Sequence, residues 1–86
     1  MAQSKLQKII EAYQDEEILV ATGFDDAVIG IETDTFRLVY SIPKCISILM
    51  GKYSMEYDEA IDFFHYNVSG SFVGEKTPIW VEDIFN

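Results

Sequence analysis

The hydrophobic and polar positions between residues 56 and 70 follow the spacing of an α-helix with two unlike faces. Apolar side chains recur every three or four residues along one face, at Tyr57, Ala60, Ile61, Phe64 and Val68. Polar side chains occupy the other face, at Asp58, Asp62 and His65. The pattern predicts an amphipathic helix that ends at Gly70. It indicates how the domain is built and leaves its activity open.

An N-terminal helix is predicted over about residues 5–14. Ser4 is placed to cap it in a capping box with Gln7. Its apolar residues have helical spacing, at Leu6, Ile9, Ile10 and Tyr13. The acidic residues 15–17 oppose the negative end of a helix, so we expect them in the exit loop, with a longer helix through Ala21 left open.

A further helix is predicted from about residue 42 to Gly51. Ser41 stands at its N-cap and Pro43 in its first turn. Its apolar stripe consists of Ile42, Cys45, Ile46 and Leu49. Because only a short link separates this helix from the helix at 56–70, the two should pack as an αα-hairpin.

Three strands are predicted from β-branched and aromatic residues. Residues 27–33 form the first, with Gly30 marking a bulge or a close approach to the backbone. Asp34-Thr35 supplies a type I-based turn, and residues 36–40 return as the second strand. Residues 79–81 form the third, which we expect to complete a three-stranded antiparallel sheet, because a lone hairpin would be marginal.

The fold class that follows is α+β in a single domain, residues 1–86. It has an N-terminal helix, an antiparallel hairpin, an αα-hairpin and a C-terminal strand that completes a small three-stranded sheet. Residues 18–21 are expected to form a short buried strand and residues 22–26 a turn. Residues 69–77 are expected to form a loop.

Composition supports a folded domain, since 49% of the residues are hydrophobic and 14% aromatic. The single cysteine, Cys45, excludes an intrachain disulfide and a cysteine-based zinc site. Lys5 and Lys8 interrupt the early apolar residues, so no signal peptide is expected. No apolar run approaches the ~20 residues that cross a bilayer. We therefore expect a cytoplasmic location.

The net charge of -9, from 15 acidic and 6 basic side chains, disfavours direct binding to nucleic acid. A basic protein surface or a metal ion is the more natural electrostatic partner. The simpler interpretation is that the charge keeps a small domain soluble.

From Gly23 onward the chain resembles a family of short uncharacterised bacteriophage proteins, also seen in bacterial genomes. The matching segments are Gly23–Ala27, Arg37–Ser41, Lys44–Ile46, Tyr57–Ala60, Phe63–Phe64, Asn67–Val68, Gly70–Gly74 and Thr77–Ile79. The family usually has Ser at the position of Glu56, and the acidic residue is expected to weaken a capping box with Glu59. The resemblance implies a phage origin and the cytoplasm of an infected host cell. It brings no established activity and assigns no catalytic residue.

The helix at 56–70 offers a candidate metal site. Asp58, Asp62 and His65 lie at i, i+4 and i+7, similar to the Glu-x-x-His of carboxylate-bridged metal helices. Such sites draw ligands from several helices, whereas His65 is the only histidine, so a solvated acidic face is favoured. Cys45 is interpreted as a buried inert thiol rather than as a nucleophile paired with His65. No catalytic residue, cofactor or metal is predicted.

Two further features are candidates for protein binding. The Gly70–Pro78 loop carries Phe72, and Trp80 follows it, so both rings could serve as apolar anchors. The alternative, slightly favoured, is that Phe72 folds under the loop to fill the core. Four acidic residues of one helix are the other candidates: Glu56, Asp58, Glu59 and Asp62.

These features predict a non-enzymatic, phage-type interaction protein that binds and modulates a host or phage protein, with no direct contact to nucleic acid or membrane. A first alternative is an acidic DNA mimic, if residues 15–17, 25–26 and 56–62 form one face. A second is a small metal-binding protein or enzyme that uses Asp58, Asp62 and His65. A homodimer is left open, since a short sheet can hide an edge in self-association.

Overall fold

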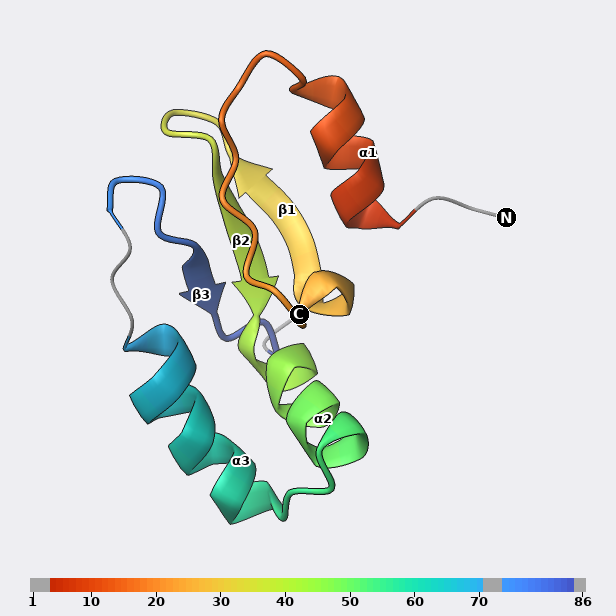
Figure 1. Ribbon diagram of the computed structural model, residues 1–86, viewed down its shortest axis with the longest axis vertical. Helices are drawn as coiled ribbons and strands as arrows, with labels where there is room; N and C mark the ends of the chain where they lie inside the picture. Colours follow the sequence, from red (N-terminus) through yellow and green to blue (C-terminus); the bar gives the residue numbers. More distant parts are fainter. Residues whose placement is uncertain (1–3, 71–73, 85–86) are drawn as a thin grey trace.

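The computed structural model describes residues 4–70 and 74–84 of the chain. Its elements, shown in Figure 1, are α1 (Lys5–Ala12), the 3-10 turn η1 (Asp25–Ala27), β1 (Val28–Glu32), β2 (Arg37–Ser41), α2 (Ile42–Lys52), α3 (Tyr57–Phe63), the π-helical segment η2 (Phe64–Ser69) and β3 (Ile79–Val81). The predicted α+β class is confirmed, with its N-terminal helix, its hairpin and its paired helices α2 and α3.

The three strands form one sheet in the order β1-β2-β3. β1 and β2 are antiparallel, and their register shifts between Val28 and Gly30, so of the two expectations for Gly30, a bulge or a close approach, the bulge is confirmed. β3 is parallel to β2, with Tyr40 opposite Trp80, so the expected antiparallel third strand was wrong. The reason is the connection: α2 leaves the end of β2, and α3 returns the chain toward the start of β2 (Figure 1).

The predicted helix starts at residues 5 and 42 are confirmed by their caps. The Gln7 backbone N–H donates to the Ser4 Oγ at 3.1 Å, and the Lys44 N–H donates to the Ser41 Oγ at 3.2 Å. At the start of α3, the Glu56 N–H donates to the Glu59 Oε1 at 3.2 Å. The capping box between Glu56 and Glu59 therefore forms, although the family that the sequence resembles usually has Ser at position 56.

The segment between α1 and β1 departs from two predictions. α1 ends at Ala12 rather than at about residue 14, and the acidic residues 15–17 follow in the exit loop as expected. Residues 18–21 are irregular rather than a strand. They are attached to the sheet through a side chain instead, since the Ala21 N–H donates to the buried Tyr40 Oη at 2.8 Å.

Aromatic rings fill the core between the sheet and the helices. The ring of Trp80 lies 4.8 Å from that of Tyr40, 5.3 Å from that of Phe64 and 6.4 Å from that of Phe24, centroid to centroid. Tyr40 and Phe64 are fully buried and are the largest such side chains in the described residues. The ring cluster thus joins β2, β3 and η2 to the turn before η1.

The predicted helix at 56–70 begins as an α-helix and ends as a π-helix, with η2 running to Ser69. Gly70 follows as the C-cap, so the predicted stop at Gly70 is confirmed. A Cβ atom there would lie 2.9 Å from the His65 carbonyl oxygen, which favours glycine at this position. Tyr57, assigned to the apolar face, is 58% exposed. Its expected burial on that face was wrong, because the start of α3 lies at the end of the helix farthest from the sheet (Figure 1).

Candidate binding groove between two helices

A surface groove runs along α2 and α3 and has a volume of about 360 Å³. We refer to it as the α2/α3 groove. Three segments supply its lining: Ile42, Pro43, Ile46, Ser47 and Met50 from α2, Tyr57, Ile61 and His65 from α3 and η2, and Glu82 and Ile84 from the segment after β3. Most of these side chains are apolar, so the groove presents an apolar floor to solvent.

The helical spacing of the sequence builds the two long walls. On α2 the lining residues Ile42, Ile46 and Met50 stand at i, i+4 and i+8. On α3 and η2 they are Tyr57, Ile61 and His65, with the same spacing. Side chains four residues apart form a ridge along one side of a helix, so each wall is one ridge. Met50 is 39% exposed and Tyr57 is 58% exposed, so both ridges are open to solvent at the far end of the hairpin.

A hydrogen bond fixes the third segment at the near end of the groove. The fully buried Ser41 Oγ donates to the Asp83 Oδ1 at 2.7 Å while it caps α2. The Asp83 carboxylate is thereby held near the positive N-terminal end of α2, where a negative charge is stabilised. This contact places Glu82 and Ile84 beside the start of α2, and Ile84 is 65% exposed.

Carboxylates border the groove along α3. Asp58 and Asp62 directly follow Tyr57 and Ile61 in sequence, and each step along an α-helix turns the side chain by about 100°. The two aspartates therefore stand on the outer side of the apolar ridge, away from the buried Ala60 and Phe64, and both are exposed. No Lys or Arg occurs between residues 53 and 75. This border of the groove is thus uniformly negative.

The candidate metal ligands are not brought together. Within residues 4–70 and 74–84, no three His, Cys, Asp or Glu side chains lie close enough to hold a metal ion. His65 instead lines the groove with Tyr57 and Ile61. His65 stands four residues after Ile61, so it shares the helix side of Ile61 rather than the polar face assigned from the sequence.

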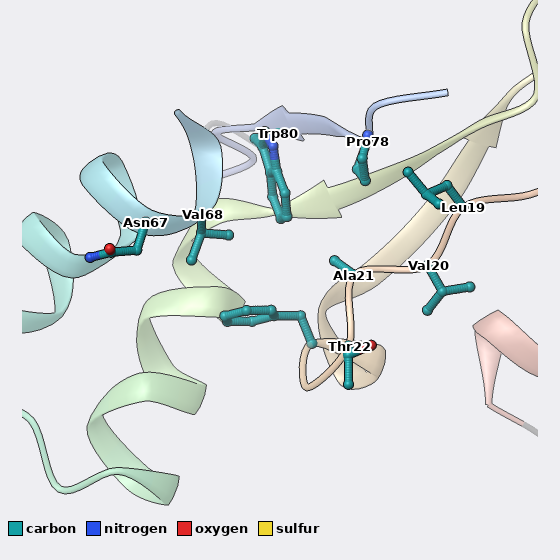
Figure 2. A pocket seen from close by; sticks show the side chains of 9 residues that line it. Leu19, Val20, Ala21, Thr22, Asn67, Val68, Pro78 and Trp80 are labelled. Atoms are coloured by element: carbon teal, nitrogen blue, oxygen red, sulfur yellow. The ribbon is translucent and has the colours of Figure 1, made fainter. Parts of the chain in front are cut away.

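Trp80, a candidate recognition residue, is partly buried and packs against the core. Figure 2 shows its ring extending from β3 into the space between Val68 and Ala21. There it lines a second cavity of about 320 Å³ with Leu19, Val20, Ala21, Thr22, Phe24, Asn67, Val68 and Pro78. Its Nε1 is buried, with no hydrogen-bond partner within the described part of the chain. Phe72, the other apolar candidate, lies outside the described residues.

None of the residues that line the groove, among them the exposed Met50, Tyr57 and Ile84, was singled out from the sequence as a protein-binding residue. The signal for two of them was present, since Met50 extends the Ile42 and Ile46 spacing and Tyr57 precedes Ile61 by one turn. Ile84 gave no local signal, because its place depends on the Ser41–Asp83 hydrogen bond. The candidate carboxylates Glu56, Asp58, Glu59 and Asp62 are all exposed.

Cys45 lies on the buried side of α2 and is fully buried. Burial raises the pKa of its thiol to about 12. A reactive cysteine needs a lowered pKa, so this environment favours the inert thiol predicted from the sequence.

The thiol of Cys45 should make the domain less stable as the pH rises above about 9. The unfolded chain loses this proton near the ordinary pKa of 9.0, whereas the folded chain keeps it until about 12. Between these values the unfolded state binds fewer protons, so ionisation favours unfolding. We expect the free energy of unfolding to fall by about 1 kcal/mol from about pH 9 to about pH 10, as measured by urea denaturation.

A Cys45→Ala variant provides the control for that measurement, since it lacks the thiol. Burial also raises the pKa of Tyr40 above its ordinary 10.0, so Tyr40 contributes mainly above the measured range. The fall between the two pH values should be shallower in the variant. Equal falls in the two proteins would contradict the raised thiol pKa.

Comparisons with protein-family models, with curated protein sequences and with solved structures find no match for this chain. No helix within the described residues is both long and apolar enough to cross a membrane. The structure therefore defines a small α+β domain with an apolar groove and an acidic border. The similarity to phage proteins stays a prediction.

Proposed function

We propose that this chain is a non-enzymatic interaction protein that binds another protein through the α2/α3 groove. The observation that carries the proposal is the open apolar floor of that groove, where Met50, Tyr57 and Ile84 are 39%, 58% and 65% exposed. Scattered apolar side chains are normal on a protein surface, but a set gathered in one groove marks an interaction site. Tyr57 is of the residue type that most often dominates binding energy in such sites.

The acidic border supports a partner with a basic surface. The exposed Asp58 and Asp62 directly follow the lining residues Tyr57 and Ile61, and no Lys or Arg lies between residues 53 and 75. A positive surface would therefore be attracted to this side of the molecule. The resemblance to phage proteins favours a phage protein or a host protein in the cytoplasm of an infected cell. Binding would alter the activity of this partner by occupying its surface.

The DNA-mimic alternative has weaker support. Mimicry needs the acidic clusters to form one continuous face. The turn that carries residues 15–17 and the helix α3 lie at opposite ends of the molecule in Figure 1. A mimic would also leave the apolar floor of the groove without a role, since it would act by charge alone.

The proposal is tested by comparing two exposed tyrosines from the same helical stretch. Tyr57 is 58% exposed and lines the groove, whereas Tyr66 is 82% exposed and does not line it. A protein captured from phage-infected bacterial lysate by the wild type should also be captured by Tyr66→Ala. Its capture by Tyr57→Ala should fall at least about tenfold, because truncation of a central aromatic residue commonly costs that much binding.

Two results would contradict the proposed use of the groove. One is that the wild type captures no protein at low salt. The other is that capture is equal for Tyr57→Ala and the wild type and is lost at moderate salt, which would favour the DNA mimic, because binding by charge alone is screened by salt.

A further inference from the structure

We propose that the α2/α3 groove binds a basic amphipathic α-helix, about three turns long, from the partner protein. In this arrangement one apolar side chain per turn lies between the two ridges, and Lys or Arg side chains face Asp58 and Asp62. The inference rests on the proposed function and specifies which kind of secondary structure in the partner protein enters the groove.

Backbone hydrogen bonding favours a helix over a strand in this groove. The walls are helices, α2 and α3, whose backbone N–H and C=O groups are largely paired within each helix. An extended peptide would place its own unpaired N–H and C=O groups on an apolar floor, at a substantial cost in free energy. A helix pairs these groups internally, so it can lie on the floor with side-chain contacts alone.

The spacing of the walls sets the length and pattern of the bound helix. Ile42 to Met50 on α2, and Tyr57 to His65, each cover nine residues, and the eight steps between the first and the last rise about 12 Å along the helix. Successive ridge residues are about 6 Å apart, which matches apolar side chains at i, i+4 and i+8 of a third helix. The Ser41–Asp83 hydrogen bond holds Glu82 and Ile84 at one end of the groove. Three apolar positions therefore span the floor.

Charge selects the polar face of the bound helix. Among the described residues that line the groove there is no Lys or Arg and one side-chain carboxylate, that of Glu82. The exposed Asp58 and Asp62 add two more along the α3 side. A helix with Lys or Arg beside its apolar stripe would meet only negative charge along this side, whereas an acidic amphipathic helix would be repelled.

Synthetic peptides of about 16 residues test this inference by fluorescence anisotropy with the full chain. The first has Leu at i, i+4 and i+8 with Lys on both sides of the stripe. The second has the same composition with one central residue replaced by Pro, which prevents a continuous helix. The third replaces Lys with Glu. We expect the first peptide to bind at least about tenfold more tightly than either of the others, and to gain helicity on binding by circular dichroism.

Protein variants locate the peptide in the groove. Tyr57→Ala and the double substitution Asp58→Asn/Asp62→Asn should each weaken binding of the Lys peptide severalfold. The double substitution should also make the affinity for this peptide depend less on salt concentration. Tyr66→Ala and Asp25→Asn/Asp26→Asn are matched controls, with exposed residues of the same types outside the groove lining, and should leave the affinity unchanged.

If the Pro peptide binds as tightly as the Lys peptide, the bound element is not a helix. If the Glu peptide binds as tightly as the Lys peptide, the helix need not be basic. Sedimentation of the protein alone tests whether a second copy fills the groove. A dimer that the Tyr57→Ala substitution dissociates would show this and would overturn the inference. If the Lys peptide fails to bind while capture from lysate still depends on Tyr57, the helical partner is wrong and the proposed function stands. If both fail, both are wrong.

Discussion

Replacing Phe64 with Ala should lower the free energy of unfolding by about 3–5 kcal/mol. Phe64 is fully buried, and its ring meets the Trp80 ring at a centroid distance of 5.3 Å with the planes nearly perpendicular. The substitution would remove a ring at the point where η2 meets the sheet and leave a cavity that the rigid strands cannot fill. Since a domain of this size has a total stability of about 5–10 kcal/mol, a large part of it would be lost.

The neighbouring residue Phe63 provides a control of identical chemistry. It is 38% exposed, so Phe63→Ala should cost much less, on the order of 1 kcal/mol. Urea denaturation of both variants and the wild type measures the difference. Similar costs at the two positions would show that the helix is rotated relative to the sheet from the arrangement described above.

Replacing Trp80 with Ala should also destabilise the fold, by about 3 kcal/mol. Within residues 4–70 and 74–84, Trp80 is the one residue whose ring contacts three others, those of Phe24, Tyr40 and Phe64. Its loss would loosen β3 from β2 and open the cavity in Figure 2. Trp80→Phe keeps an aromatic ring and should cost about half as much or less. Thermal unfolding followed by far-UV circular dichroism measures both.

The same variant separates the two interpretations of Trp80. If Trp80→Ala leaves the melting temperature unchanged but abolishes partner capture, Trp80 is a recognition residue, as one interpretation of the sequence proposed. Loss of stability with retained capture at low temperature supports the core role.

Local signals in the sequence were sufficient for the helices and their caps. Ser4 and Ser41 cap their helices as predicted, because an N-cap depends on only the next few residues. The β1–β2 hairpin and its bulge near Gly30 were predicted for the same reason. These elements form from contacts between near neighbours in the chain.

Long-range contacts decided the features that were missed. The direction of β3 depends on the whole path through α2 and α3, which no local pattern encodes. Residues 18–21 have the composition of a strand, yet β1, β2 and β3 form the sheet without them, and Tyr40 holds them by its hydroxyl group. The groove combines α2, α3 and the segment after β3, so the sequence revealed its ridges but not their alignment.

The parallel pairing of β3 with β2 has a consequence for how the domain assembles. The hairpin β1–β2 closes over a few residues, but β3 can join only after the intervening chain has traversed both helices. The α2–α3 hairpin needs only local contacts, whereas β3 and the Ser41–Asp83 hydrogen bond close about forty residues of chain. We expect the end of the groove that Glu82 and Ile84 form to appear late, together with the last strand, so that a partially folded chain has an incomplete binding surface.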